Sequence, residues 1–161
     1  MHIFITVGSQ KFQFNRLLSA VDRLVSEGRI TDEVFAQIGS GDYVPQHFPS
    51  RPFLDQDAFA ARLDWADIVL THGGTGVIIN AVKRGKKVIA VPRLARYGEH
   101  VDDHQIELLR QFEELELICR WDDCGTLDEA VALVKKTDYR PYQSNTRAII
   151  DSIEDFIRSV F

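Results

Sequence analysis

The strongest constraint on this chain is the stretch of residues 67–105, in which two short apolar runs flank a cluster of glycines. The run Ile68–Leu70 predicts a buried strand. It is followed by the sequence HGGTG at residues 72–76, a predicted helix at Val77–Lys83 and a second buried strand at Val88–Val91. This βαβ unit leaves unpaired backbone N–H groups at a helix N-terminus. Because these donors and the helix dipole favour negative charge, we expect a phosphate or diphosphate ligand.

Length and composition limit the class of protein. A chain of 161 residues is long enough for one domain and too short for two, so we expect a single domain over residues 1–161. The net charge of -5 argues against a general nucleic-acid binder. No apolar run approaches the roughly 20 residues that span a bilayer, and no signal-peptide pattern opens the chain. Cys119 and Cys124 have neither redox nor zinc spacing, which predicts reduced thiols in the cytoplasm.

The rest of the chain alternates between predicted strands and helices. Strands are expected at residues 3–7, 34–38, near 53–54 and at 117–119, and helices at 14–26, 56–65, 103–114, 127–134 and about 144–161. Three prolines predict irregular structure from residue 43 to 52. The alternation predicts an α/β fold with a doubly wound parallel sheet.

Five segments carry a resemblance to a known family. They are IFITVGSQKFQFNRLLSAVDRL, QIGSGDYVP, ADIVLTHGGTG, GKKVIAVPR and DDHQ, and they cover most of residues 1–114 in order. The chain resembles the C-terminal, donor-binding domain of GT-B glycosyltransferases of family 28. Among these it is most similar to the single-domain subunits of split enzymes, which are the catalytic subunit of the dolichol-linked N-acetylglucosaminyltransferase and bacterial exopolysaccharide and capsule subunits. The resemblance implies a Rossmann-like sheet equivalent to the C-terminal half of a GT-B fold.

The resemblance also implies a function and a partner. We expect the donor-binding and catalytic subunit of an inverting glycosyltransferase that transfers a hexose from a UDP-sugar to a lipid-linked or polysaccharide acceptor. In the split enzymes the acceptor half is a separate, membrane-associated protein. We therefore expect a cytoplasmic chain held at the inner face of the membrane by an acceptor-binding partner, with little or no activity alone.

Departure of UDP builds negative charge on its β-phosphate, and this charge must be stabilised in the transition state. GT-B enzymes generally do so with helix N-termini and backbone N–H groups, which implies no metal cofactor here. The expected contacts are Gly73, Gly74, Thr75 and Gly76, with Gly8 and Ser9 from the facing loop. A Cβ would block the close approach of backbone to diphosphate. The alternative is that these glycines only make a tight turn.

Two further positions are expected to contact the ribose and the donor sugar. Asn80 stands where the family usually has an acidic residue that accepts hydrogen bonds from both ribose hydroxyls. An amide oxygen also accepts, but without the charge that strengthens such a bond. His104 and Gln105 match the family's His-Gln pair, whose glutamine usually reaches hydroxyls of the donor sugar. The alternative is an exposed pair without a ligand contact.

Arg93 and His72 each leave two interpretations open. Arg93 follows a predicted strand and is either a phosphate ligand or a solvated surface side chain. His72 either hydrogen-bonds the diphosphate or is a structural histidine that shapes the turn. No catalytic residue is assigned, because the general base of an inverting transfer is expected on the partner, with His72 as a secondary candidate.

Two other classes of site fit these residues less well. The sequence HVDDH at residues 100–104 places two histidines four apart, but the zincin pattern requires glutamate where Val101 stands, so we expect no metal site. An NAD-binding fold would have G-x-G-x-x-G after the first strand, where this chain has GSQKFQ. A non-catalytic nucleotide-sugar or protein-binding module on the same fold remains the alternative.

The predicted C-terminal helix at residues 144–161 has a marked apolar stripe. The stripe consists of Ile149, Ile153, Phe156, Ile157 and Val160. Such a stripe most often packs on the chain's own sheet. Because apolar residues gather at the very end of the chain, the alternative is a docking surface for the acceptor subunit or for a second copy in a homodimer.

Overall fold

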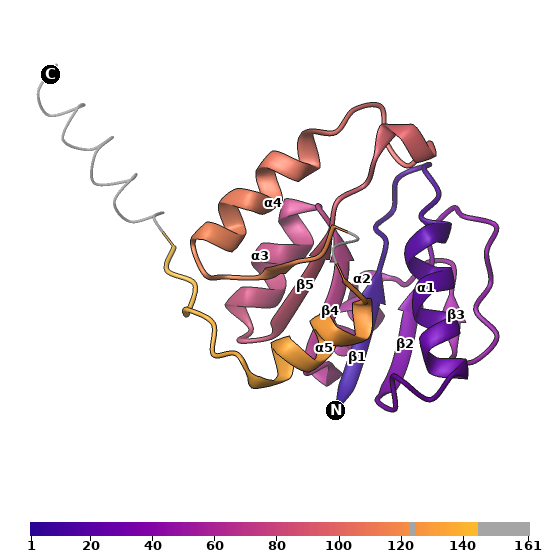
Figure 1. The fold of residues 1–161 in the computed structure, drawn as a ribbon, viewed down its shortest axis with the longest axis horizontal. Helices are drawn as coiled ribbons and strands as arrows, with labels where there is room; N and C mark the ends of the chain where they lie inside the picture. Colours follow the sequence, from indigo (N-terminus) through magenta and orange to yellow (C-terminus); the bar gives the residue numbers. More distant parts are fainter. Residues whose placement is uncertain (123–124, 145–161) are drawn as a thin grey trace, which may run out of the picture.

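In the computed structural model, which describes residues 1–122 and 125–144, parallel strands form one sheet in the order β3-β2-β1-β4-β5-β6 (Figure 1). The strands are β1 (His2–Thr6), β2 (Glu33–Gln37), β3 (Ser50–Arg51), β4 (Ile68–His72), β5 (Lys87–Val91) and β6 (Cys119–Arg120). The helices are α1 (Asn15–Ser26), α2 (Gln56–Trp65), α3 (Thr75–Lys83), α4 (His104–Glu114) and α5 (Leu127–Lys136), with a 3-10 turn η1 (Ala95–Tyr97). The predicted doubly wound parallel sheet is confirmed.

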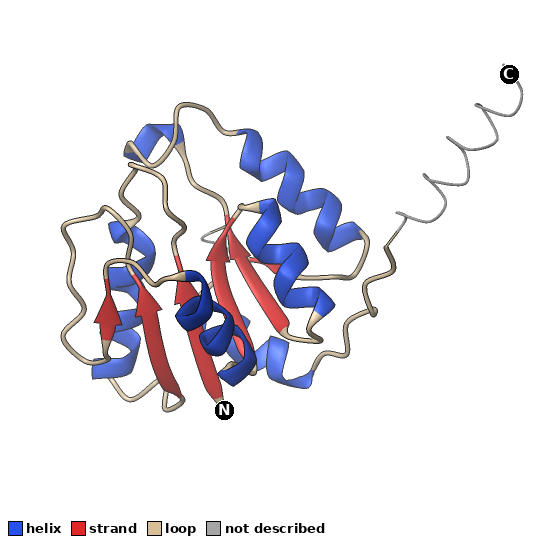
Figure 2. Cartoon of the chain, turned by 180° about the vertical axis from the view of Figure 1, so that it is seen from behind, coloured by secondary structure: helices blue, strands red, loops and turns tan. Residues whose placement is uncertain are grey.

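Helices cover both faces of the sheet. Figure 1 shows α1 and α5 on one face, and Figure 2, seen from behind, shows α2, α3 and α4 on the other. Successive residues of a strand alternate between these layers. Ile3 and Ile5 of β1 pack with α1 and α5, whereas Phe4 between them packs with the opposite helices. Burial on both faces explains why the central strands are continuous apolar runs.

The order of the strands creates a switch point between β1 and β4. From β1 the chain crosses through α1 to β2 on one side, and from β4 it crosses through α3 to β5 on the other side. The loops that leave the carboxyl ends of β1 and β4 therefore diverge. In open α/β sheets such a divergence forms the crevice where ligands bind.

Element boundaries agree with the sequence prediction within two residues for five strands and for all described α-helices. The strand expected near residues 53–54 is wrong: β3 is Ser50–Arg51, between Pro49 and Pro52. Both prolines contribute carbonyls to the sheet, since Ala36 N–H donates to Pro49 O and Gly39 N–H donates to Pro52 O. A proline can serve an edge strand in this way because no N–H is required of it there.

The last strand is also displaced from its expected position. It pairs through Cys119–Arg120 instead of residues 117–119, because Leu117 N–H still donates to Phe112 O and so remains tied to the end of α4. The predicted C-terminal helix and Cys124 lie outside the described residues. Among residues 1–122 and 125–144, no helix combines the length and the apolar character that crossing a bilayer requires.

The irregular segment after β2 is held to α1 by one buried carboxylate. Asp22 accepts hydrogen bonds from the N–H groups of Gln46 and His47, at 3.0 and 2.9 Å, and from the hydroxyl of Tyr43 at 2.8 Å. Burial alone would raise the pKa of Asp22, but these donors outweigh it and the pKa is lowered. A lowered carboxylate pKa means that the ionised group stabilises the fold.

Replacing this carboxylate tests its contribution to stability. We expect Asp22→Asn to lower the free energy of unfolding at pH 7 by about 1–3 kcal/mol, because buried donors lose a charged acceptor. The stabilisation is present above the unfolded pKa and is lost as the pH falls through the lower folded pKa. The difference between Asp22→Asn and wild type in urea unfolding should therefore shrink below about pH 4.

Asp42→Asn is the matched control, because Asp42 is in the same segment and accepts only an exposed hydrogen bond from Asn15 among those described. Its unfolding free energy should stay within about 0.5 kcal/mol of wild type. Equal destabilisation by the two substitutions would contradict the role of Asp22.

Candidate functional site

The glycine loop lies at the carboxyl end of β4, beside the loop that leaves β1. The two strands pair in parallel up to Thr6 and Thr71, so Gly8 and His72 follow at the same edge of the sheet. Gly74 precedes the first residue of α3 and takes the place of its N-cap. The predicted strand, glycine turn, helix and strand are therefore present, and they sit at the β1–β4 switch point.

The imidazole of His72 packs directly against the backbone of two glycines. A Cβ on Gly8 would lie 2.6 Å from Cε1 of His72, and a Cβ on Gly74 would lie 2.5 Å from Nε2. Gly8 also has a φ of +79°, a conformation that disfavours any side chain. Both glycines are thus required by contact with this histidine, which is an additional reason for their presence besides the approach of a ligand.

Burial holds the His72 ring in its neutral form. The side chain is 7% exposed, and burial, reinforced by the nearby Arg93 cation, lowers its pKa from 6.5 to about 4. The hydroxyl of Thr71 donates to Thr6 O at 2.9 Å and lies 3.3 Å from Nδ1 of His72. Since the hydroxyl proton is used on Thr6, Thr71 can only accept from Nδ1–H. With its proton on Nδ1 the neutral ring would donate to Thr71 and keep a lone pair on Nε2.

The first turn of α3 presents free backbone donors. Gly73 N–H is already used, since it donates to Oε1 of Gln105 at 3.0 Å. Within the described chain, the N–H groups of Gly74, Thr75 and Gly76 have no hydrogen-bond partner, and no side chain caps the helix. Thr75 and Gly76 are exposed. These three amides, at the positive end of the helix dipole, are suited to an anion.

Gln105 joins two loops of this edge. Its Oε1 accepts from Gly73 N–H and from Arg93 N–H, each at 3.0 Å, and a Cβ on Gly73 would lie 2.8 Å from it. The carbonyl is therefore committed to the protein, and the NH2 group is the part that remains for a ligand. His104 lies at the rim, 89% exposed, with Nδ1 3.2 Å from Oδ1 of Asp102.

The structure supports neither of the two interpretations offered for Arg93. Its side chain is 1% exposed, so it is not a surface arginine. Its guanidinium donates to the carbonyls of Val7, Gln13 and Glu99, at 2.5, 2.8 and 3.1 Å, which leaves it directed into the protein and not toward a phosphate. Burial lowers its pKa to about 10, so it is a cation at neutral pH.

Asn80 and Ser9 are exposed. Oδ1 of Asn80 accepts from Nε of Arg84 at 3.0 Å, and Arg84 also pairs with Asp64 on α2. A ribose would thus meet an amide whose oxygen is already engaged. The spacing of four residues between Asn80 and Arg84 was the sequence signal for this pair, whereas the contact with Asp64 joins helices that are separate in the sequence.

The two histidines of HVDDH share one carboxylate oxygen. Oδ1 of Asp102 is 3.2 Å from Nδ1 of His100 and 3.2 Å from Nδ1 of His104. In the part of the chain that the structure describes, no group of three or more His, Cys, Asp or Glu side chains has an arrangement that could hold a metal ion. The contacts around Asp102 order the start of α4, where His104 N–H also donates to it.

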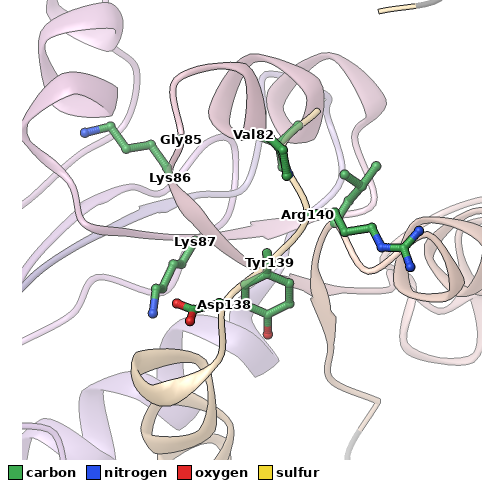
Figure 3. A pocket seen from close by; sticks show the side chains of 9 residues that line it. Val82, Gly85, Lys86, Lys87, Asp138, Tyr139 and Arg140 are labelled. Atoms are coloured by element: carbon green, nitrogen blue, oxygen red, sulfur yellow. The ribbon is translucent and has the colours of Figure 1, made fainter. Parts of the chain in front are cut away.

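A cavity of about 270 Å³ lies at the opposite edge of the sheet, where β5 begins (Figure 3). Its lysines are already engaged: Nζ of Lys86 donates to Asp64 O at 2.7 Å, and Nζ of Lys87 donates to Lys135 O at 2.9 Å. Arg140 pairs with Glu116. Because its cations are used within the protein, this cavity is a poorer anion site than the free amides of α3.

Solved glycosyltransferases share the fold. The NMR solution structure of ALG13 superposes with a TM-score of 0.58, covering 94% of each chain at 16% identity. The crystal structure of the glycotransferase of kitacinnamycin gives a TM-score of 0.62 over 84% of this chain and 35% of that chain, at 19% identity. The six-stranded parallel α/β fold is therefore shared with solved GT-B glycosyltransferases.

The chain belongs to the glycosyltransferase family 28 C-terminal domain, whose sequence model matches residues 2–160. Human UDP-N-acetylglucosamine transferase subunit ALG13 is 29% identical over 119 residues, which are 70% of this chain and 10% of that protein. The mouse protein of the same name is 27% identical over 118 residues, with 69% and 10% covered. The chain thus spans about a tenth of the length of these relatives. The expected family is confirmed.

Two glycines of the loop should differ in their tolerance of a side chain. We expect Gly74→Ala to be destabilising, because its Cβ would lie 2.5 Å from Nε2 of His72. Gly76→Ala is the matched control, because no heavy atom lies within 4 Å of its Cβ. There alanine should raise the free energy of unfolding by up to about 1 kcal/mol through helix propensity. Urea unfolding of both variants checks this, and equal effects would contradict the contact.

The neutral state of His72 predicts a pH dependence of stability. Because its folded pKa of about 4 is below the ordinary 6.5, the unfolded chain binds more protons between these values. The free energy of unfolding should fall as the pH drops from about 6.5 to 4, by about 3 kcal/mol in total. His72→Gln should reduce this slope. Urea unfolding at several pH values measures it, and identical slopes would refute the assignment.

Proposed function

We propose that this chain is the donor-binding and catalytic subunit of a UDP-sugar-dependent glycosyltransferase. The observation that carries the proposal is the set of free N–H groups of Gly74, Thr75 and Gly76 at the N-terminus of α3, located at the β1–β4 switch point. Amides in this position suit a diphosphate. Because the chain belongs to a glycosyltransferase family, we assign this diphosphate to a sugar nucleotide.

The amides also suit the chemical step. When an acceptor oxygen attacks the anomeric carbon and the bond to UDP breaks, negative charge grows on the β-phosphate, and fixed donors stabilise it without reorganisation. His72 does not supply such a donor while its ring is neutral and protonated on Nδ1, since Nε2 then only accepts. The amides therefore provide the charge stabilisation, and a metal ion is not required in this proposal.

We assign the remaining polar groups at this edge to different parts of the UDP-sugar. The NH2 group of Gln105 is fixed by the two hydrogen bonds to its own carbonyl, and we assign it to a hydroxyl or acetamido oxygen of the sugar. Asn80, whose oxygen holds Arg84, is left with its NH2 group for a ribose oxygen. The loss of a charged acceptor at this position predicts modest affinity for the nucleoside.

The relatives support the finer parts of the proposal. The human relative is named as a subunit of a UDP-N-acetylglucosamine transferase, which favours N-acetylglucosamine as the hexose and a heteromeric enzyme. We infer an inverting transfer to a lipid-linked or polysaccharide acceptor. The acceptor would be held by a membrane-associated partner that supplies the general base, with this chain on the cytoplasmic face.

Nucleotide binding by the purified chain tests the proposal directly. In calorimetry, UDP and UDP-N-acetylglucosamine should bind, while a GDP-sugar and NAD should not, and EDTA should leave the affinity unchanged. Gly74→Val should abolish binding because its side chain would occupy both the His72 contact and the diphosphate position. Gly28→Asn is the control, because asparagine tolerates the left-handed φ of this turn, which lies at the end of α1, away from the site.

The outcomes separate the candidate functions. A transfer assay would use UDP-N-acetylglucosamine with a radiolabelled sugar. If transfer occurs only when a membrane fraction containing the partner is added, the subunit assignment is supported. Binding of uridine nucleotides without transfer under any of these conditions would favour a non-catalytic module on the same fold. Absence of any uridine response would overturn the proposed donor site.

A further inference from the structure

The buried guanidinium of Arg93 connects two loops that flank the candidate site. One is the β1–α1 loop, which it contacts at Val7 O, Phe12 O and Gln13 O, at 2.5, 3.2 and 2.8 Å. The other is the β5–α4 loop, which contains Arg93 itself and Glu99, whose carbonyl it contacts at 3.1 Å. The guanidinium carbon also lies 4.8 Å from the centre of the Phe14 ring.

An ion pair with a buried carboxylate joins the β5–α4 loop to the first turn of α1, directly after the β1–α1 loop. Glu99 is completely buried, and its two carboxylate oxygens accept from Nε and Nη2 of Arg16, both at 3.0 Å. Nη2 of Arg16 also donates to Pro92 O at 3.0 Å, and Leu94 N–H donates to Glu99 at 2.9 Å. A buried carboxylate persists only where partners satisfy it, and here both of its oxygens accept hydrogen bonds.

The connection extends to the glycine loop. The N–H of Arg93 and the N–H of Gly73 share the Oε1 atom of Gln105. The side chain of Arg93 therefore holds the loop after β1, and its backbone is linked through one oxygen to the loop after β4. Gly8, in the first of these loops, also contacts the His72 ring that contacts Gly74 in the other.

We propose that Arg93 is a positioning residue, whose guanidinium fixes Gly8 and Ser9 of the β1–α1 loop opposite the free amides of α3. It does not contact the ligand. The identity of the ligand rests on the proposed function, whereas the positions of the loops in the free protein do not. The proposal adds to the description of the site, because it assigns the shape of the β1–α1 loop to a residue that the sequence suggested as a phosphate ligand.

Arginine is suited to this role in a way that lysine is not. The carbonyls of Val7, Gln13 and Glu99 approach the guanidinium from different directions, and a planar fork with five N–H donors can serve all of them at once. The single ammonium of lysine keeps the charge and much of the buried volume, but it cannot hold every carbonyl in place. Arg93→Lys therefore loosens the β1–α1 loop with the smallest change in packing.

Two variants and a control test the proposal in the full chain. Arg93→Lys removes the fork. Glu99→Gln weakens the parallel link to Arg16 while keeping the volume and an acceptor for Leu94 N–H. Arg110→Met is the control, because Arg110 is exposed on α4 and makes only surface ion pairs with Glu107 and Glu114 among the described residues.

The first readout is backbone 15N relaxation of the ligand-free protein, which needs no donor. In Arg93→Lys and Glu99→Gln we expect the order parameters of Gly8, Ser9 and Gln10 to fall, while those of strands β1 and β4 stay at wild-type values. In Arg110→Met all of these order parameters should stay at wild-type values. The second readout is calorimetry with UDP, where the first two variants should bind about tenfold more weakly and the control should bind like wild type.

Each outcome has a definite meaning. Unchanged order parameters in a folded Arg93→Lys would overturn the positioning role, whatever happens to UDP binding. Loss of order throughout the sheet would also overturn it, because it would show a general structural role. If wild type fails to bind UDP while the loop loosens as expected, the proposed donor is wrong and the positioning of the loop stands.

Discussion

The parallel pairing of β1 with β4 is the constraint on which the rest of this structure depends. It brings the first strand of the chain beside a strand that begins more than 60 positions later, at Ile68, and sends their outgoing loops to opposite sides. The placement of the two loops, the free N-terminus of α3 and the environment of His72 all follow from that pairing. A helix N-terminus elsewhere on the sheet would present the same amides without a second loop to complete a site.

Charged groups in the interior connect the loops on either side of this edge. Arg93 and Glu99 have almost no contact with solvent. The Nη groups of Arg93 donate to loop carbonyls, while its Nε has no partner among the described residues. The carboxylate of Glu99 accepts from Arg16 and from Leu94 N–H. Uncharged side chains of similar size would bury well but would leave those loop groups without partners. The buried charged side chains at this edge therefore determine the shape of the loops more than they add to the free energy of unfolding.

The sequence predicted the architecture well because periodicity and glycine placement are local signals. The edge strand Ser50–Arg51 was misplaced because two flanking prolines contribute through their carbonyls, a long-range effect that no local pattern reveals. Arg93 was misread for a related reason: its position after a strand is visible in the sequence, but the carbonyls that attract it come from residues about 80 positions earlier. The glycine loop was correctly located, whereas the protonation of His72 required knowledge of its burial.

The contact of His72 with two glycines constrains evolutionary substitution differently at each of them. Gly74 has an ordinary φ of −75°, so within the ligand-free protein the His72 ring, and not the backbone, excludes a side chain there. With a small residue at position 72, a relative could fold with alanine or serine at position 74. Gly8 would still be constrained by its left-handed backbone. Substitutions at 72 and 74 should therefore covary within the family, while the glycine after the first strand should persist independently of both.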